Sequence, residues 1–251
     1  MGKKRVAGRA RLADSDREFA SHSPVQNGGQ SREGSGCHQA VANGLPGVGG
    51  GITQETARVI RAFIAIELPE PVRAAVAEAQ RRLRRAPVGV KISWSNPANL
   101  HLTLQFLGEI PAERVAEISA GLAQVAAMVP PFEVEVAGVG GFPDLQRPRV
   151  IWVGCRDATG RLRELAERVR GLGWRAEEHE FTPHLTLGRV KTPRPDGALT
   201  RALDCLTTQS FGTMRVEAVH LFQSQLHPHG SVYTTLSSHT LQGEREHAGQ
   251  S

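Results

Sequence analysis

Two copies of a four-residue motif carry the side chains of this sequence best suited to chemistry. The first is His101-Leu102-Thr103-Leu104 and the second is His184-Leu185-Thr186-Leu187. Because alternate residues of a β-strand point to one face, each histidine shares a face with its threonine, while the leucines are buried on the other face. One imidazole can take a proton from a nucleophile while the other gives one to a leaving group, and the hydroxyls can donate to phosphate oxygens. The motifs predict a two-histidine acid–base site.

Two other interpretations of these motifs stay open on the residues alone. A single histidine in an amphipathic strand is usually a surface residue or a satisfied core residue, but two copies at matching positions favour function. A histidine metal site is the lesser functional alternative, because no carboxylate or third histidine stands at ligand spacing. We therefore expect a site that uses no metal and no cofactor.

Composition narrows the class of protein. The chain has 251 residues, of which 39% are hydrophobic and 22% are charged, as in soluble globular proteins. No apolar run approaches the roughly 18 residues that span a bilayer, and no apolar segment follows the basic start, so we expect neither membrane insertion nor a secretory signal. The cysteines Cys37, Cys155 and Cys205 form no CxxC pair, which favours incidental thiols in a reducing cytoplasm.

The elements that must position the two motifs form a repeated pattern. Hydrophobic periodicity predicts helices at about 70–83, 111–125, 162–172 and 198–206. It predicts strands at 62–66, 90–94, 100–107, 132–136, 150–153, 174–178, 184–190, 216–222 and 232–236, with a loop at 138–148. The order strand, helix, strand, strand, helix, strand runs twice, and the second copy has one extra strand. We predict an α+β fold of two pseudosymmetric lobes, each a mainly antiparallel sheet with helices on its outer face, around a central cleft.

The composition also predicts where this folded region begins and ends. Residues 1–57 are rich in Gly and Ser, are basic, and carry few large apolar residues, which predicts a disordered tail. Residues 58–241 form the expected bilobal domain, with lobes at roughly 60–138 and 149–241, and residues 242–251 are expected to be frayed.

Three segments of the chain resemble a known family. They are Arg61-Ala62-Phe63-Ile64-Ala65-Ile66-Glu67-Leu68-Pro69, Asn99-Leu100-His101-Leu102-Thr103-Leu104-Gln105-Phe106-Leu107-Gly108 and Phe181-Thr182-Pro183-His184-Leu185-Thr186-Leu187-Gly188-Arg189-Val190. With the paired His-x-Thr-x motif, they are similar to the bacterial RNA 2′,3′-cyclic phosphodiesterases, also called 2′-5′ RNA ligases, of the 2H phosphoesterase superfamily. The resemblance covers about residues 60–241 and implies a bilobal fold around a central cleft.

The resemblance also implies an activity and its residues. The reaction would be hydrolysis of a 2′,3′-cyclic phosphate at an RNA end to a 2′-phosphomonoester. His184 would be the general base that activates water, and His101 the acid that protonates the leaving 3′-oxygen. Thr103 and Thr186 would hold the phosphate oxygens. Some members also form and cleave a 2′-5′ linkage between tRNA halves.

The resemblance likewise implies the partners. They would be RNA ends with a 2′,3′-cyclic phosphate, among them tRNA halves and small cyclic nucleotides, and we expect a cytoplasmic monomer. A non-catalytic RNA-binding module on the same fold is the alternative, although intact His and Thr in both motifs argue against it.

Two residues close to the motifs are further candidates. Arg189 lies five residues after His184 and Phe106 five residues after His101. An arginine at that place suits phosphate binding, and a phenylalanine suits base stacking, with core packing as its alternative. Strict strand alternation puts both on the wrong face, so the prediction for Arg189 requires that Gly188 or the strand's end redirects it.

The remaining candidates are weaker. Lys191 and Arg194 would add positive potential beside Arg189. The arginines of the first helix and the segment His227-Pro228-His229 are interpreted as a solvated helix face and a surface turn; the arginines are Arg81, Arg82, Arg84 and Arg85.

Overall fold

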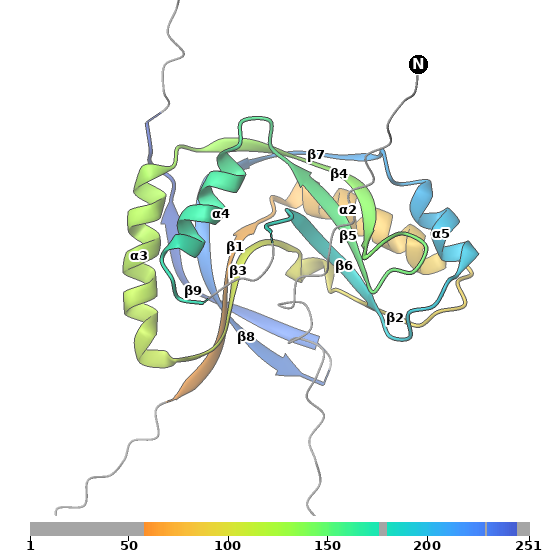
Figure 1. Cartoon of the computed structure of the whole chain (residues 1–251), viewed down its shortest axis with the longest axis horizontal. Coiled ribbons are helices and arrows are strands. Elements are labelled where there is room, and N and C mark those ends of the chain that lie inside the picture. Colours follow the sequence, from red (N-terminus) through yellow and green to blue (C-terminus); the bar gives the residue numbers. More distant parts are fainter. Residues whose placement is uncertain (1–57, 176–179, 229, 245–251) are drawn as a thin grey trace, which may run out of the picture.

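Nine strands form two antiparallel sheets in the computed structural model, which describes residues 58–175, 180–228 and 230–244 (Figure 1). The four-stranded sheet has the order β3-β1-β8-β9 and the five-stranded sheet the order β2-β6-β5-β4-β7. Every neighbouring pair is antiparallel. The strands are β1 (Val59–Glu67), β2 (Ile92–Trp94), β3 (His101–Pro111), β4 (Phe132–Phe142), β5 (Val150–Arg156), β6 (His184–Val190), β7 (Ser210–Val216), β8 (Ala218–His227) and β9 (Gly230–Thr240).

Four α-helices of the described residues cover these sheets. They are α2 (Glu70–Arg85), α3 (Val115–Met128), α4 (Arg161–Gly171) and α5 (Gly197–Asp204), and short 3₁₀ turns lie at Pro97–Asn99 and Ala112–Arg114. In the four-stranded sheet, α3 contacts β8 and β9, and α4 contacts β3. In the five-stranded sheet, α2 contacts β7 and α5 contacts β4. The predicted α+β class with helix-covered antiparallel sheets is therefore confirmed.

The division of the chain between the two sheets differs from the expected lobes at 60–138 and 149–241. The four-stranded sheet joins β1 and β3 from the first half to β8 and β9 from the end of the chain. In the five-stranded sheet, β2 and β4 from the first half pair with β6, β5 and β7. Each sheet thus draws on both copies of the repeated pattern.

The helices form where their apolar stripes predict them. In α2 a proline stands in the first turn, and the buried side chains include Val72, Val76, Ala79 and Leu83 at helical spacing. Leucines of both motifs belong to the same core as the buried faces of the helices. The helices therefore pack on the leucine faces of β3 and β6, and the histidines and threonines point to the opposite faces.

Several expectations for the strands are wrong. The expected loop at 138–148 begins only after Phe142, because β4 continues through Gly138, which forms a bulge at φ +75°. The glycines disfavour a strand by propensity, but a Cβ at Gly140 would clash with the indole of Trp152, so the packing favours glycine there.

Three further differences concern the second half. Strand β7 was not expected, and the strand predicted at 216–222 is β8, which begins at Ala218. Trp174 and Arg175 lie outside any strand, and the rest of the strand expected at 174–178 lies outside the described residues. The backbone of Gln242 donates to Ala126 O at 2.9 Å, so the ordered chain passes the expected end at residue 241. The predicted tail at 1–57 lies outside the described residues.

The apolar interior has a second, smaller part. Phe63, Ala65 and Phe222 form a buried cluster against which Phe106 and Tyr233 pack. This cluster is separate from the core beneath the helices and lies on the histidine face of the four-stranded sheet. None of the described helices has both the length and the apolar character needed to cross a lipid bilayer.

Candidate active site

The two histidines of the motifs occupy equivalent places. His101 begins β3 and His184 begins β6, and both side chains are half-buried. Nδ1 of His101 lies 2.7 Å from Asn99 O, and Nδ1 of His184 lies 2.7 Å from Thr182 O. A carbonyl only accepts, so each Nδ1–H donates to the backbone two residues earlier. This fixes both rings in one tautomer, with the lone pair of the neutral imidazole on Nε2.

The strands that carry the motifs lie side by side although they belong to different sheets. Strands β3 and β6 contact each other. Burial lowers the pKa of His101 to about 4; its bond to Asn99 O opposes this, and the charge of His184 lowers the pKa further. The two imidazoles therefore lie within reach of each other's electric field, and His101 is neutral at pH 7 in the free protein.

The threonines take the faces that the alternation predicts. Thr103 and Thr186 are half-buried like the histidines, whereas the motif leucines are 0–1% exposed. Thr103 pairs with Ala65 of the small aromatic cluster, and Thr186 pairs with Trp152. Each hydroxyl thus stands two residues from its histidine and on the same face.

Bulges place Phe106 and Arg189 on the faces of the histidines. In β3, Thr103 pairs with Ala65 and Gln105 with Ile64, so Leu104 is an extra residue between them. In β6, Thr186 pairs with Trp152 and Gly188 with Ile151, which leaves Leu187 as the extra residue. An extra residue shifts the alternation by one. The expectation from strict alternation, that both side chains point to the wrong face, is therefore wrong.

Contacts agree with these positions. The rings of Phe106 and Phe63 lie 6.2 Å apart between centroids, and Phe63 in turn lies 4.7 Å from His101. Burial raises the pKa of Tyr233, and the positive charge of Arg189 opposes this rise. Arg189, from the five-stranded sheet, therefore lies near a tyrosine of the other sheet.

Aromatic side chains that sequence reasoning missed surround both histidines. The ring of Tyr233 meets His101 edge-on, at 5.3 Å and 84°. Phe142 meets His184 in the same manner, at 5.1 Å and 87°, and Trp152 lies 6.4 Å from His184. These rings limit water around the imidazoles and strengthen electrostatic interactions there. Only the pairing of distant strands brings them to the histidines, so the available signal was alternation within the expected strands 150–153 and 232–236, and Phe142 lay in the expected loop.

The weaker candidates either make contacts with other parts of the fold or are exposed. Arg194 donates to Gly89 O at 2.7 Å, and Arg81 forms an ion pair with Glu78 on the exposed side of α2. Lys191 is exposed at the end of β6, where its backbone N–H donates to Lys91 O. His227 is exposed where β8 ends, before the turn to β9, and His229 lies outside the described residues.

In the part of the chain that the structure describes, neither the cysteines nor the potential metal ligands form a second site. Burial raises the pKa of the Cys155 thiol to about 12, whereas Cys205 is exposed; Cys37 lies outside the described residues. Within the described ranges, no group of three or more His, Cys, Asp or Glu side chains gathers as metal ligands would.

Comparisons with known proteins agree with this arrangement. The sequence model of the LigT like phosphoesterases matches the chain twice, at residues 66–152 and 153–233. An RNA 2′,3′-cyclic phosphodiesterase of Archaeoglobus fulgidus is 37% identical over 181 residues, which cover 70% of this chain and 98% of the relative.

Solved structures show the same likeness. A Thermus thermophilus crystal structure superposes with a TM-score of 0.60 at 34% identity, covering 74% of this chain and 100% of the other. The crystal structure of E. coli LigT complexed with phosphate has a TM-score of 0.55 at 27% identity, with 73% and 98% covered. The two matches of the sequence model each include one His-x-Thr-x motif and together span more than half of the chain, so this protein belongs to the LigT-like family of 2H phosphoesterases.

Proposed function

We propose that this protein is an RNA 2′,3′-cyclic phosphodiesterase that hydrolyses the cyclic phosphate to a 2′-phosphomonoester. The observation that carries the proposal is the contact between β3 and β6, which bring two backbone-oriented histidines and their threonines together. The activity named for the Archaeoglobus fulgidus relative and the phosphate in the complex of E. coli LigT support it.

In this reaction the two imidazoles divide the proton transfers. Nε2 of His184 takes a proton from water, whose oxygen attacks phosphorus. The bond from phosphorus to O3′ breaks, and Nε2 of His101 gives its proton to O3′. The hydroxyls of Thr103 and Thr186 donate to the non-bridging oxygens, and Arg189 neutralises the charge that builds up on them. The product keeps its phosphate on O2′.

The low pKa of His101 makes proton loading part of this proposal. A general acid must be protonated, yet burial keeps His101 neutral at pH 7 in the free protein. The bound cyclic phosphate carries a negative charge, which favours the imidazolium and raises the pKa of a histidine beside it. Substrate binding therefore loads the proton that the leaving oxygen needs.

The finer parts of the proposal rest on the same residues. Proton transfers by two histidines and charge neutralisation by an arginine supply the reaction without a metal or cofactor. Ligation would use the same pair, with a ribose hydroxyl of a tRNA half in place of water. Small cyclic nucleotides are included as substrates, because the reacting groups are confined to one phosphate. A cytoplasmic location and a monomeric state stay predictions.

Product analysis tests the proposal directly. A short RNA with a 2′,3′-cyclic phosphate is incubated with the protein in EDTA, and the ends are separated by chromatography against 2′- and 3′-phosphate standards. We expect the 2′-phosphate alone. Binding without turnover would contradict the proposal and favour the non-catalytic RNA-binding module. A 3′-phosphate product would reverse the assignment of the leaving oxygen.

A further inference from the structure

Helix α2 carries two polar side chains that reach toward the two halves of the site. Arg73 and Gln80 are seven residues apart, close to two helical turns, so they lie on nearly the same side of the helix. Neither belongs to a His-x-Thr-x motif. Each hydrogen-bonds to backbone carbonyls in or near the segments that position the site residues.

Gln80 bonds to the bulge of β6. Its side chain is 0% exposed, and Nε2 donates to Ser95 O at 2.8 Å and to Leu187 O at 3.0 Å. Leu187 is the extra residue that returns Arg189 to the face of His184. Ser95 N also donates to Leu187 O, at 2.8 Å, so this carbonyl receives two donors. Because both partners of the amide are acceptors, a residue without N–H groups cannot replace it.

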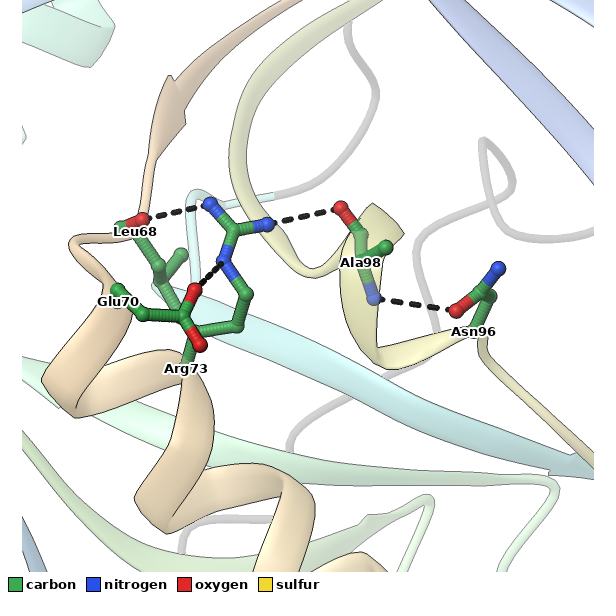
Figure 2. Close-up of polar contacts among 5 residues, drawn as sticks. All are labelled: Leu68, Glu70, Arg73, Asn96 and Ala98. Atoms are coloured by element: carbon green, nitrogen blue, oxygen red, sulfur yellow. Dashed lines mark hydrogen bonds and ion pairs between the residues drawn. The ribbon is translucent and has the colours of Figure 1, made fainter.

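Arg73 bonds to the turn that precedes His101. Figure 2 shows its guanidinium between two carbonyls, donating to Leu68 O at 2.7 Å and to Ala98 O at 2.8 Å, while Glu70 approaches Nε at 3.5 Å. Asn96 Oδ1 accepts from Ala98 N in the same turn. The next residue, Asn99, supplies the carbonyl that accepts from Nδ1 of His101.

We propose that α2 holds the backbone in place in both halves of the site. Gln80 is then a positioning residue for Arg189, and Arg73 is a positioning residue for His101. The inference rests on the proposed function. The segment between β2 and β3 connects the two effects, because β2 pairs with β6 and the chain then enters β3 through the turn at Pro97–Asn99. A bulge has an extra residue outside the regular ladder, so its geometry depends on bonds from outside the sheet.

The Gln80 part is tested by a double-mutant cycle with Arg189. Gln80→Met keeps the volume but removes both donors. We expect kcat on a cyclic mononucleotide to fall about tenfold and KM to change by less than about threefold, because the loss acts on the transition state. In Arg189→Ala, the same change should lower kcat by less than about threefold, since the residue being positioned is absent.

The outcomes of the cycle separate the inference from the proposed function. Val125→Ala is the control for a general loss of stability, because Val125 is buried on α3 and distant in sequence from both Gln80 and Arg189. It should lower kcat equally with and without Arg189. If the double variant loses kcat by the full product of the two single reductions, or if Gln80→Met leaves kcat unchanged, the inference is overturned. If Arg189→Ala itself has normal kcat, the assigned role of Arg189 fails instead, and the Gln80 inference falls with it. Should Gln80→Met not fold, Gln80→Asn enters the same cycle and is judged by the same criteria.

The Arg73 part is tested by the tautomer of His101. In ¹⁵N spectra, Arg73→Met should weaken the Nδ1–H signature of His101, leave that of His184 unchanged, and lower kcat about tenfold. Glu70→Gln is the control, because it leaves the bond from Arg73 to Ala98 O in place. It should change neither the tautomer of His101 nor kcat. An unchanged His101 tautomer in folded Arg73→Met overturns this part. If that variant does not fold, Arg73→Lys is measured in its place, with a smaller shift in the same direction expected.

Discussion

Tyr233 meets the imidazole of His101 edge-on, with 5.3 Å between ring centroids and 84° between ring planes. The two residues come from β9 and β3, which do not pair with each other. The ring of Phe63 of β1 contacts both of them, with its centroid 4.9 Å from Tyr233 and 4.7 Å from His101. The imidazole is therefore held by a backbone carbonyl on one atom and by two aromatic rings.

Removing the Tyr233 ring should loosen His101. We expect Tyr233→Leu to lower kcat about tenfold, because the acid then samples other orientations. Tyr233→Phe keeps the ring and should stay within about threefold of the wild type. Steady-state kinetics on a 2′,3′-cyclic nucleotide compare the two, and a large loss in Tyr233→Phe would show that the hydroxyl, rather than the ring, takes part.

The histidines should each be required for turnover. We expect His101→Ala or His184→Ala to lower kcat by roughly 10²–10⁴-fold, the usual contribution of one general acid or base. Folding should survive, since both rings are only half-buried. Single-turnover assays on a cyclic-phosphate RNA, with circular dichroism as the folding control, provide the measurement. Near-normal turnover in a folded variant would remove that histidine from the mechanism.

The low pKa of His101 gives the folded state a predictable dependence on pH. The pKa is about 4 in the folded protein and about 6.5 in an unfolded chain, so between these values the unfolded state binds more protons. The contribution of His101 to the free energy of unfolding should therefore be fully present above about pH 6.5. It should decrease as the pH falls toward 4, by up to about 3 kcal/mol. Urea titrations of the wild type and His101→Gln measure it, and an equal slope in both would contradict the low pKa.

Binding of an anion should move that pKa upward. We expect the NMR titration of His101 to have its midpoint near pH 4 in the free protein and at least one unit higher with a 2′-nucleotide bound, because the phosphate favours the imidazolium. His220, whose pKa burial also lowers, is the internal control and should shift less. A midpoint for His101 that ignores the nucleotide would contradict proton loading by substrate.

Arg189 and Phe106 should separate chemistry from RNA binding. A guanidinium pairs with two phosphate oxygens in a fork that lysine lacks, so Arg189→Lys should lower kcat about tenfold although the charge is kept. Phe106→Leu should leave kcat/KM for a cyclic mononucleotide unchanged and lower it about three- to tenfold for an RNA end, if its ring stacks on a base. Kinetics of both variants on both substrates decide; unchanged turnover in Arg189→Lys and Arg189→Ala would place this side chain outside the site.

Local patterns were sufficient for some of this architecture. The apolar stripes predicted the helices, and alternation placed each histidine on the same face of its strand as its threonine, because these features depend on neighbours in sequence. Strand β7 was not predicted, because its buried and exposed side chains do not alternate regularly and Gly212 lies at φ +114°.

The placement of Phe106, Arg189 and Tyr233 depends on partners distant in sequence. Leu104 and Leu187 become extra residues only through the registers with β1 and β5. Gln80 gave no signal either, since a glutamine within an apolar stripe has meaning only once the carbonyls facing it are known. The division of strands between sheets was equally beyond local reasoning, because both halves carry the same order of elements.

The exchange of strands between the halves has a consequence for synthesis of the chain. Strand β1 pairs with β8, so the four-stranded sheet beside His101 cannot be completed until β8 has left the ribosome. A product that stops before Ala218 would contain both His-x-Thr-x motifs but lack Phe222 and Tyr233. Premature termination there would yield chains with all four motif residues but without Tyr233, whose ring contacts His101, and without Phe222, which packs on Phe63.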